Sequence, residues 1–376
     1  MTRKIQKFLA EQKPATPCLV IDLDVVGENY RKLRGAVPRA GIYYAIKANP
    51  APEVLRLLAG LGSSFDVASM GEVEMVLATG VGAERISFGS TIKKSTEIAE
   101  AHAKGVRLYC FDSAAELDKI ATNAPGSKVF CRILTSNEGA EWPLSRKFGC
   151  DVEMARELLV SAKDRNVIPH GVSFHVGSQQ RDPKQWDAAI AQAAWLFQEC
   201  EQRGVSLAML NIGGGFPTRY RRQVPQMAEY GAAIDESLRR HFGNRIPSEI
   251  VVEPGRQIVG DAGVIQTEVI LISTKSAKEK RRWVYLDVGK FGGLAETMDE
   301  AIQYPIVTPR KGPAERVIIA GPTCDSADVL YEKADYRLPL DLQIGDKVEI
   351  KSTGAYTTTY SSVGFNGFEP LRTYCI

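Results

Sequence analysis

The 376-residue sequence has no charge excess of one sign, no long apolar run and no paired-cysteine motif. Its 47 Lys and Arg residues nearly balance its 45 Asp and Glu residues, which leaves a formal net charge of +2. Nucleic-acid binders and polybasic membrane proteins need a basic excess on one face, so the composition argues against both classes. A membrane helix would need about 18 consecutive apolar residues, and a signal peptide would need an apolar segment behind the charged start of the chain. Neither segment is present, so we expect a cytoplasmic protein without membrane or nucleic-acid partners.

The seven cysteines are odd in number and include no C-x-x-C pair. Structural zinc sites and the disulfide frameworks of small secreted domains use cysteines at short, paired spacings. We therefore interpret these cysteines as free thiols in a reducing compartment and expect no metal site. A hydrophobic content of 44% with 24% charged residues is typical of a globular enzyme. At roughly 100–200 residues per domain, the length predicts two domains, or one barrel with a smaller partner.

From residue 41 to residue 256, short β-rich runs alternate with longer helical patterns, which is typical of successive βα units with a parallel sheet. Eight such repeats in roughly 215 residues predict a (β/α)₈ barrel. The expected strands are Ile42–Lys47, Phe65–Ser69, Arg85–Ser90, Arg107–Asp112, Val129–Leu134, Val172–Val176, Leu210–Gly214 and Ile250–Glu253. The expected helices are Pro52–Gly60, Gly71–Thr79, Lys93–Lys104, Ala114–Ala121, Val152–Arg165, Trp186–Arg203 and Pro225–Phe242, with Pro52 and Pro225 in opening turns.

After Arg256 the pattern changes to β-rich runs separated by turn residues, which favours an antiparallel β domain. We also place the N-terminal run Pro17–Leu23 with this domain. The predicted fold class is α/β plus all-β. A TIM-like barrel spans residues 24–256, and a β-sandwich or β-barrel domain spans residues 257–376 together with the N-terminal strand within residues 1–23. The expected C-terminal strands are Val264–Ser273, Arg282–Val288, Arg316–Ala320 and Lys347–Lys351.

Barrel enzymes carry their chemistry at the carboxyl ends of the strands. In this sequence, polar residues or glycines recur at that position of the repeat around most of the predicted barrel. They are Lys47, Asp66, Ser69, Gly89, Ser90, Arg132, His175, Ser178, Gly213, Gly214, Gly215, Glu253, Gly255 and Arg256.

Lys47 follows the apolar residues of the first predicted strand. Such a strand would hold the amine partly out of water, and desolvation lowers the pKa of a lysine toward nucleophilic use. The pattern therefore allows covalent chemistry with a carbonyl group. A surface lysine whose stem lies along the apolar strand fits the same spacing.

Three glycines, Gly213 to Gly215, follow the seventh predicted strand. They would let backbone N–H groups approach a phosphate, and Arg256 could add positive charge. A simple tight turn uses glycine for the same conformational freedom. The cluster does not extend to G-x-G-x-x-G, which disfavours a Rossmann dinucleotide site.

Glu253 could accept a hydrogen bond from a protonated ring nitrogen, and the flat ring of His175 could stack on a cofactor ring. Taken singly, Glu253 could instead form a salt bridge and His175 could be a hydrogen-bonded core residue. A lysine, a phosphate cradle, a carboxylate for a ring nitrogen and a stacking ring together are the groups that pyridoxal 5′-phosphate (PLP) needs. Their shared position at strand ends favours that cofactor.

The sequence resembles the PLP-dependent decarboxylases of the alanine racemase fold type, in particular the ornithine/lysine decarboxylase branch. The resemblance covers essentially the whole chain, and the motifs appear in the family's order. They are Tyr44-Ala45-Ile46-Lys47-Ala48-Asn49, Phe65-Asp66-Val67-Ala68-Ser69, Lys147-Phe148-Gly149, His175-Val176-Gly177-Ser178-Gln179, Asn211-Ile212-Gly213-Gly214-Gly215-Phe216-Pro217, Glu253-Pro254-Gly255-Arg256, Gly321-Pro322-Thr323-Cys324-Asp325-Ser326, Gly354-Ala355-Tyr356 and Phe365-Asn366-Gly367-Phe368.

The resemblance implies a role for each cofactor-site residue. Lys47 would bond covalently to PLP, Glu253 would keep the ring nitrogen protonated, and His175 would stack on the ring. Ala45 and Asp66 would lie beneath or beside the ring. Arg132 would be a buried partner near the ring and Lys47. The phosphate would be held by Ser178, the backbone of Gly213, Gly214 and Gly215, Gly255, Arg256 and the hydroxyl of Tyr356.

The resemblance also implies a head-to-tail homodimer in which Cys324 and Asp325 reach into the other subunit's site. Cys324 would protonate the product carbanion at Cα, and Asp325 would bind the distal amine of the substrate. Asp299 would be a second amine-binding acid, and Phe365 would contact the departing carboxylate. From the residues alone, Cys324 would be interpreted as an inert core thiol. Likewise, Asp299-Glu300 would be interpreted as acids at a helix N-terminus facing solvent.

The expected reaction is conversion of L-ornithine to putrescine and CO₂ in polyamine biosynthesis, with lysine, which gives cadaverine, as a further substrate. In the diaminopimelate branch the motif reads Cys-Glu-Ser, followed by basic groups, whereas Cys324-Asp325-Ser326 suits a cationic side-chain end. One methylene is worth only about 1–3 kcal/mol of discrimination. Lysine, arginine, carboxynorspermidine and diaminopimelate therefore stay open as alternative substrates. A non-catalytic homologue of the antizyme-inhibitor type would have lost site residues that are intact here, and a racemase would have an arginine in place of Glu253.

Overall fold

The computed structural model describes residues 1–142, 147–279 and 281–376. Contacts divide the chain into two compact units. The barrel unit comprises residues Gly27–Pro217 and Val224–Gly255, and the β unit comprises Met1–Val26, Thr218–Gln223 and Arg256–Ile376. Within the described residues, no helix combines the length and apolarity needed to cross a membrane.

The barrel unit contains a closed barrel of eight strands in the order β10-β11-β2-β3-β4-β5-β6-β8. All neighbouring strands pair in parallel. The strands are short and mostly buried, as expected where helices cover a parallel sheet. This confirms the predicted barrel. The strands are β2 (Ala40–Ala45), β3 (Ser64–Val67), β4 (Ile86–Phe88), β5 (Leu108–Phe111), β6 (Lys128–Arg132), β8 (Ile168–Ser173), β10 (Met209–Asn211) and β11 (Glu249–Val252).

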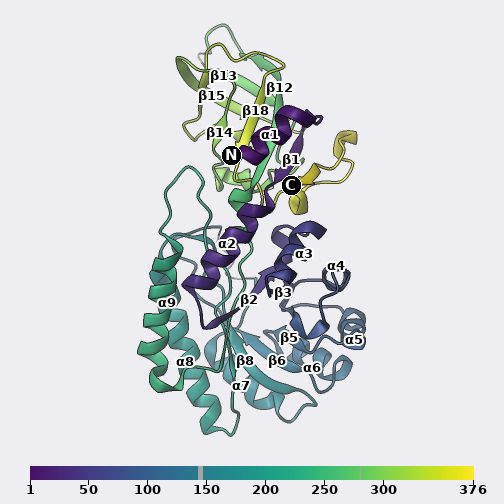
Figure 1. Cartoon of the computed structure of the whole chain (residues 1–376). Helices are drawn as coiled ribbons and strands as arrows, with labels where there is room; N and C mark the ends of the chain where they lie inside the picture. The colour runs from purple at the N-terminus through teal and green to yellow at the C-terminus, as the bar shows by residue number, and fades with distance from the viewer. Residues whose placement is uncertain (143–146, 280) are drawn as a thin grey trace. The chain divides into compact units, whose positions relative to one another are not determined.

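Helices surround these strands (Figure 1). Several begin at a side-chain cap, because the first backbone N–H groups of a helix have no partner within it. Ser69, Ser113 and Asp151 each accept a hydrogen bond from the backbone N–H three residues later. The helices are α2 (Leu23–Ala36, in this unit from Gly27), α3 (Pro52–Gly60), α4 (Met70–Leu77), α5 (Ser95–Ala103), α6 (Ala114–Asn123), α7 (Val152–Ala162), α8 (Trp186–Gln202) and α9 (Met227–Phe242).

Strands far apart in the sequence contribute to one buried hydrophobic cluster, formed by Cys110, Phe130, Met209 and Val251. These residues lie on β5, β6, β10 and β11. Layers of side chains from several strands fill the centre of such barrels. The carboxyl ends of the strands are therefore fixed relative to one another, and loops that follow them are held at one end of the barrel.

Three local predictions about this unit are wrong. Lys47 lies on the 3₁₀ turn η1 (Ile46–Ala48) and not on the strand, which ends at Ala45. Pro225 precedes the first turn of α9, because Gln226 is the N-cap and forms a capping box with Glu229.

Lys93 was predicted to begin a helix, but it precedes α5. Its side chain is fully buried, and Nζ donates to the carbonyl oxygens of Ser90 and Cys110, both at 2.6 Å. Nζ also lies 2.9 Å from a carboxylate oxygen of buried Glu116. A buried ammonium is stable only when it is fully paired. These partners explain why Lys93 lies in the loop after β4 and not on the first turn of a helix.

The β unit contains a nine-stranded sheet with the order β14-β18-β12-β13-β15-β16, to which β1, β17 and β19 add. Most pairings are antiparallel, as predicted, but β1 with β19 and β13 with β15 pair in parallel. Connections longer than hairpins, including the segment between β13 and β15, allow these parallel pairs. The strands are β1 (Cys18–Ile21), β12 (Gly263–Ser273), β13 (Arg282–Leu286), β14 (Ile306–Val307), β15 (Ala314–Ala320), β16 (Val329–Tyr331), β17 (Arg337–Pro339), β18 (Lys347–Lys351) and β19 (Arg372–Cys375).

The N-terminal segment is part of this sheet, because β1 pairs with both β12 and β19. Helix α1 (Arg3–Gln12) packs Ile5 and Leu9 against Cys18, Val20 and Val264. The remaining elements are β7 (Ala140–Trp142), β9 (Ser178–Gln180), α10 (Arg256–Val259), η2 (Ala83–Arg85), η3 (Pro183–Gln185), η4 (Gly243–Arg245), η5 (Gly260–Ala262), η6 (Ala295–Glu300), η7 (Thr358–Tyr360) and η8 (Phe365–Gly367).

Candidate active site

Lys47 and Asp66 meet at the carboxyl end of the barrel. Nζ of Lys47 lies 3.3 Å from Oδ2 of Asp66. The pair forms because Ala45, at the end of β2, is in register with Asp66 on β3. The sequence suggested a partly desolvated amine. The structure shows a side chain that is 49% exposed and ion-paired with a carboxylate that is 4% exposed. A lysine held by a buried acid at the mouth of a barrel differs from a mobile surface lysine.

The carboxylate of Asp66 has one atom without a partner. Its Oδ1 is buried and accepts no hydrogen bond from the residues that the structure describes. Burial raises the pKa of Asp66, and the positive charges of Lys47 and Arg132 oppose this rise. A buried oxygen without a donor is costly, so it suits a site that a ligand completes.

Glu253 follows β11 and is held by Asn211, the last residue of β10. The amide nitrogen of Asn211 donates to Oε1 of Glu253. The amide oxygen of Asn211 accepts from the backbone N–H of Gly213 at 2.9 Å. Because that backbone donor fixes which side of the amide is the oxygen, the nitrogen must face Glu253. Asn211 is 1% exposed and was not among the predicted site residues.

The electrostatic environment raises the pKa of Glu253 from 4.5 to about 7. Burial is the main cause and the negative charge of Asp66 adds to it, while Lys47, Asn211 and Arg132 oppose it. A carboxyl whose pKa is higher in the folded than in the unfolded protein binds its proton more tightly when folded. In the cofactor-free protein, the stabilising contribution of Glu253 is therefore lost as the pH rises from about 4.5 to about 7.

We expect Asn211→Ala to move the titration of Glu253 in cofactor-free protein to a pH above about 7. The reason is that this substitution removes a hydrogen bond that favours the carboxylate. Infrared difference spectra recorded across pH measure the protonated carboxyl band directly. Glu253→Gln is the control, since it lacks the titrating group. A band in Asn211→Ala that titrates at or below the wild-type pH would contradict this account of Glu253.

His175 follows β8 and is half-buried, so it is not a core histidine. Its Nδ1 accepts a hydrogen bond from the backbone N–H of Gly177 at 3.0 Å. Burial, with the charges of Arg132 and Lys47, holds the pKa of His175 well below its usual value. The ring is therefore neutral near pH 7 and carries its proton on Nε2. A neutral, oriented imidazole is suited to lie flat against another ring.

The three glycines after β10 fit tightly between neighbouring loops. A Cβ atom on Gly213 would lie 2.2 Å from the carbonyl oxygen of Phe174, and one on Gly214 would lie 2.4 Å from that of Glu253. A Cβ on Gly215 would lie 2.6 Å from the carbonyl oxygen of Gly177. Both Gly213 and Gly215 also have positive φ. The glycines therefore form a close-packed cradle beside His175 and Glu253, which is more than a tight turn requires.

The remaining predicted residues of the barrel unit lie around the same end. Arg132 ends β6 and is half-buried, where a buried side chain was expected, with its guanidinium 5.4 Å from the ring centre of Phe148. Ser178 begins β9, and Gly255 is buried after Glu253. The positive charges of Lys47 and Arg132 both lower the pKa of Asp66 and that of Glu253, so these side chains lie close together.

In the β unit, Arg256 is engaged by an acid that the sequence analysis did not identify. Its guanidinium forms a bidentate pair with Glu296, with nitrogen–oxygen distances of 2.7 and 2.5 Å, and donates to the hydroxyl of Tyr220 at 2.6 Å. The ring of Tyr356 lies 4.8 Å from it. Arg256 and Glu296 are 3% and 2% exposed, so the pair is buried. The structure thus brings the predicted Arg256 and Tyr356 together, with Glu296 fixing the guanidinium.

Cys324 and Asp325 are exposed on the loop between β15 and β16. Exposure excludes the alternative of an inert core thiol. Oδ1 of Asp325 accepts from the backbone N–H of Ala327 at 2.8 Å. Phe365 is half-buried, and its ring centre lies 4.9 Å from that of Phe291.

Asp299 and Glu300 lie at the end of η6 and not at a helix N-terminus, which corrects the alternative reading of this pair. Both have positive φ, of 52° and 57°. The carboxylate of Glu300 accepts from the backbone N–H groups of residues 332, 333 and 334 at 2.7, 2.7 and 2.6 Å. These hydrogen bonds hold a backbone kink that leaves Asp299 exposed.

Comparison with known proteins assigns the chain to a family. A model described as the pyridoxal binding domain of pyridoxal-dependent decarboxylases matches residues 23–260. The lysine/ornithine decarboxylase of Selenomonas ruminantium is 40% identical over 372 residues, which cover 98% of this chain and 91% of that protein. The chain belongs to the ornithine/lysine decarboxylase family of PLP-dependent enzymes.

Two further proteins are similar to this chain. A crystal structure of lysine/ornithine decarboxylase from Vibrio vulnificus, complexed with cadaverine, has a TM-score of 0.88 and 32% identity, and the match covers 100% of this chain and 99% of that one. Antizyme inhibitor 2 of Xenopus laevis is 34% identical, and the match covers 93% of this chain and 78% of that protein.

The cofactor of the family is PLP, and the barrel unit fits it. The fit rests on the unpartnered buried oxygen of Asp66 and on the cradle of Gly213, Gly214 and Gly215, which a single Cβ would fill. The donor set agrees with the cofactor's chemistry, because an amine, a carboxyl group and a neutral imidazole lie at the same end of the barrel. The chain is thus an amino-acid decarboxylase of this family with a cofactor site of matching chemistry.

Proposed function

We propose that this protein decarboxylates L-ornithine to putrescine and CO₂ in polyamine biosynthesis, and that it also converts lysine to cadaverine. The observation that carries the proposal is an exposed carboxylate, Asp325, beside the exposed thiol of Cys324. Asp325 and Asp299 are both exposed, so either carboxylate is accessible to an ammonium group. The name of the Selenomonas relative supports both substrates.

PLP, when bound, would store the electron pair that is left when the bond from Cα to the carboxylate breaks. In our proposal Lys47 would be the amine that holds the cofactor. The carboxylate of Glu253, oriented by Asn211, would keep a proton on the ring nitrogen. The neutral ring of His175 would lie against the cofactor ring without adding a second positive charge. The cradle of Gly213 to Gly215, with Ser178, Gly255, Arg256 and Tyr356, would hold the phosphate.

The residues of the β unit act on the substrate in this proposal. Cys324 donates the proton that Cα takes up after CO₂ leaves, and it is reprotonated before the next turnover. Asp325 and Asp299 bind the distal ammonium of the substrate. Phe365 offers an apolar contact to the carboxylate, whose negative charge disappears when it departs as neutral CO₂.

We further propose that the active sites are shared between the subunits of a homodimer. Each chain would supply its Lys47 to one site and its Cys324 to the other. The exposure of Cys324 and Asp325 supports this arrangement, because groups that act on a second copy must be accessible on their own chain.

Mixing two inactive variants, Lys47→Ala and Cys324→Ala, tests the shared site. Random exchange gives mixed dimers in which one of the two sites has both groups, so we expect recovery of about a quarter of wild-type turnover. Native mass spectrometry measures the mixed-dimer fraction in the same sample. Absence of recovery in a sample that contains mixed dimers would show that the two residues act within one chain.

The substrate assignment is tested by kcat/KM for ornithine, lysine, arginine and diaminopimelate, measured side by side with saturating PLP. We expect ornithine to lead and lysine to follow within about 10–200-fold, which is the range for one methylene in a pocket. Arginine or diaminopimelate in first place would overturn the proposed substrate while leaving the decarboxylase assignment intact. A second candidate function, regulation without catalysis, rests on the likeness to an antizyme inhibitor, and the intact site residues argue against it. PLP binding without turnover of any of the four amino acids would support that candidate.

A further inference from the structure

The loop that carries Cys324 joins β15 to β16 and has little contact with the core. Residues 324 to 327 are all exposed. The loop closes on itself at its base, because the backbone N–H of Gly321 donates to the carbonyl oxygen of Asp328 at 2.8 Å. The N–H of Asp328 donates to the carbonyl oxygen of Asp325 at 3.0 Å. These two bonds define a turn but do not by themselves fix the direction of the Cys324 side chain.

A buried carboxylate anchors the loop from within. Asp328 is 2% exposed, and its Oδ2 accepts from the backbone N–H and from the hydroxyl of Thr323 at 3.1 and 2.7 Å. Its Oδ1 accepts from the backbone N–H of Lys290 at 2.7 Å. The carboxylate therefore ties the residue before Cys324 to the segment that follows β13.

Two glycines make room for this carboxylate. A Cβ atom on Gly289 would lie 2.2 Å from Oδ1 of Asp328, and a Cβ atom on Gly321 would lie 2.4 Å from the same oxygen. Neither glycine has a positive φ, so backbone conformation does not require glycine at either position. Both positions need glycine because a Cβ atom there would clash with the carboxylate of Asp328. Gly289, Gly321 and Asp328 thus together form one buried anchor for the loop.

A second side chain holds Cys324 itself. The backbone N–H of Cys324 donates to Oδ1 of Asn366 at 3.0 Å. Asn366 belongs to η8 and has a φ of 51°, a left-handed conformation that asparagine adopts more readily than most residues. The backbone amide of Cys324 is therefore held by a residue 42 positions later in the chain.

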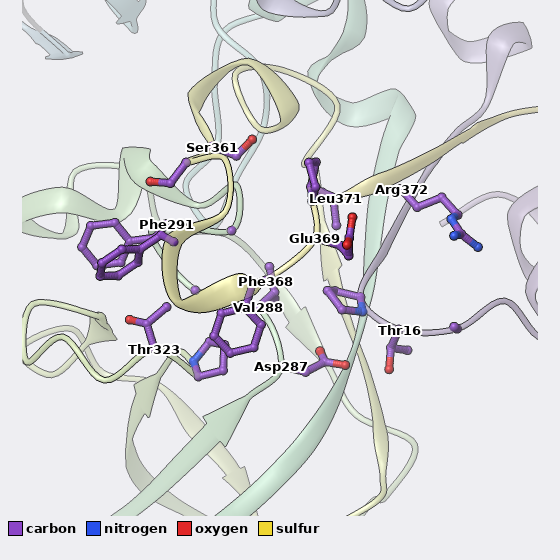
Figure 2. A pocket seen from close by; sticks show the side chains of 18 residues that line it. Thr16, Asp287, Val288, Phe291, Thr323, Ser361, Phe368, Glu369, Leu371 and Arg372 are labelled. Atoms are coloured by element: carbon purple, nitrogen blue, oxygen red, sulfur yellow. The ribbon is translucent and has the colours of Figure 1, made fainter.

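Packing cannot replace these hydrogen bonds, because a cavity of about 520 Å³ lies beside the loop. Thr323 and Pro322 line it together with Val288, Phe365 and Phe368, and Figure 2 shows Thr323 close to its aromatic wall. A side chain that borders a cavity has no van der Waals partner on that side. The position of the loop therefore depends on Asp328 and Asn366.

We propose that Asp328 and Asn366 are positioning residues that aim the thiol of Cys324 for proton delivery to Cα. This inference rests on the proposed function, because it assumes that Cys324 is the proton donor. Asp328→Asn keeps the shape of the side chain, but places an NH₂ group against N–H donors that need an acceptor. Asn366→Ala removes the acceptor of the Cys324 amide. Both variants should leave the thiol present and misdirected.

The test measures the product ratio in PLP-loaded enzyme. A carbanion protonated at Cα gives the amine, whereas protonation at the cofactor carbon would give, after hydrolysis, aminated cofactor and the aldehyde with the carbon skeleton of the product amine. Misplacing a catalytic group by about 1 Å can cost roughly 10²-fold, so we expect the aldehyde fraction to rise at least about tenfold in both variants. Ser326→Ala, a change to an exposed residue of the same loop, is the matched control and should keep the wild-type ratio.

A second readout does not depend on catalysis. Iodoacetamide alkylation of Cys324, followed by mass spectrometry on cofactor-loaded protein without substrate, reports the setting of the thiol. We expect the alkylation rate to change at least about threefold in both variants and not in Ser326→Ala, because a released loop gives the thiol a different environment. Asn366 is exposed, so its variant remains informative if Asp328→Asn fails to fold.

The outcomes separate this inference from the proposed function. If Cys324→Ala yields aldehyde while Asp328→Asn and Asn366→Ala keep the wild-type ratio and alkylation rate, the positioning role is overturned and the role of Cys324 stands. If Cys324→Ala itself gives only amine at the wild-type rate, the proposed proton donor is wrong. The alkylation rate then still decides whether the two residues hold the loop, since an unchanged rate in both variants refutes it.

Discussion

Replacing Lys47 by alanine should remove the visible absorbance of bound cofactor and lower kcat at least about 10⁴-fold, the scale found when a covalent catalytic group is deleted. The expected loss is large because the variant has no amine at position 47 to bond to the cofactor. Lys47 is the lysine that Asp66 holds at the carboxyl end of the barrel, at 3.3 Å. The measurement is an absorbance spectrum and a turnover assay on protein reconstituted with excess PLP.

Lys94→Ala is the matched control for this experiment, since Lys94 is exposed in the same unit. That variant should keep both the absorbance band and the wild-type rate. If Lys47→Ala retained the band and turned over normally, Lys47 would have no covalent role. A loss of both properties in Lys94→Ala would instead indicate general damage to the barrel unit.

Replacing Cys324 by alanine should slow formation of the amine by about 10²–10⁴-fold, the usual contribution of a positioned general acid. It should also divert part of the reaction to the aldehyde with the carbon skeleton of the product amine, because the carbanion then takes its proton at the wrong carbon. Quantifying CO₂, amine and aldehyde from one reaction measures both effects. CO₂ release should continue at a reduced rate, since Cys324 acts after the carboxylate has left.

The Cys324 prediction fails if the variant forms amine alone at the wild-type rate. Cys324→Ser provides a graded comparison, because a hydroxyl of similar size is a much weaker acid than a thiol. It should lie close to Cys324→Ala in its product ratio. A serine variant equal to wild type would show that the position needs only a polar group.

The helices and strands could be predicted from the sequence because the spacing of apolar residues follows which side chains are buried. All eight barrel strands lie within a few residues of the predicted runs, and the pairing of each with its neighbours follows from the alternation of strands and helices. The position of polar residues also followed from this architecture. Lys47, Asp66 and Glu253 meet because parallel strands in a barrel end on one side.

Contacts made by single side chains could not be predicted from the spacing of residues in the sequence. Asn211 lies at the end of a strand, two residues before the glycine cradle, and this position could have indicated a site residue. Its hydrogen bond to Glu253 depends on the orientation of its side chain, which the sequence does not give. Glu296 gives no signal in its spacing to Arg256, because the two residues lie 40 positions apart. The same applies to Asn366 and Cys324, which are 42 positions apart.

Local conformation was the other source of error. Asp299 and Glu300 read as helix-terminal acids in the sequence, but both take positive φ in a kink that three backbone N–H groups stabilise. Lys93 reads as the start of a helix, yet it lies in the loop before α5, where its buried ammonium contacts Ser90, Cys110 and Glu116. In both cases long-range hydrogen bonds outweighed local propensity.

PLP-dependent decarboxylation of ornithine is the reaction that we propose for this chain. The most direct measurement is the amount of CO₂ and of putrescine that the purified protein forms from L-ornithine, with and without added PLP, after removal of bound cofactor. We expect equal amounts of the two products, formed only when PLP is restored. Putrescine formation that does not depend on PLP, or restored PLP binding with neither product formed, would contradict it.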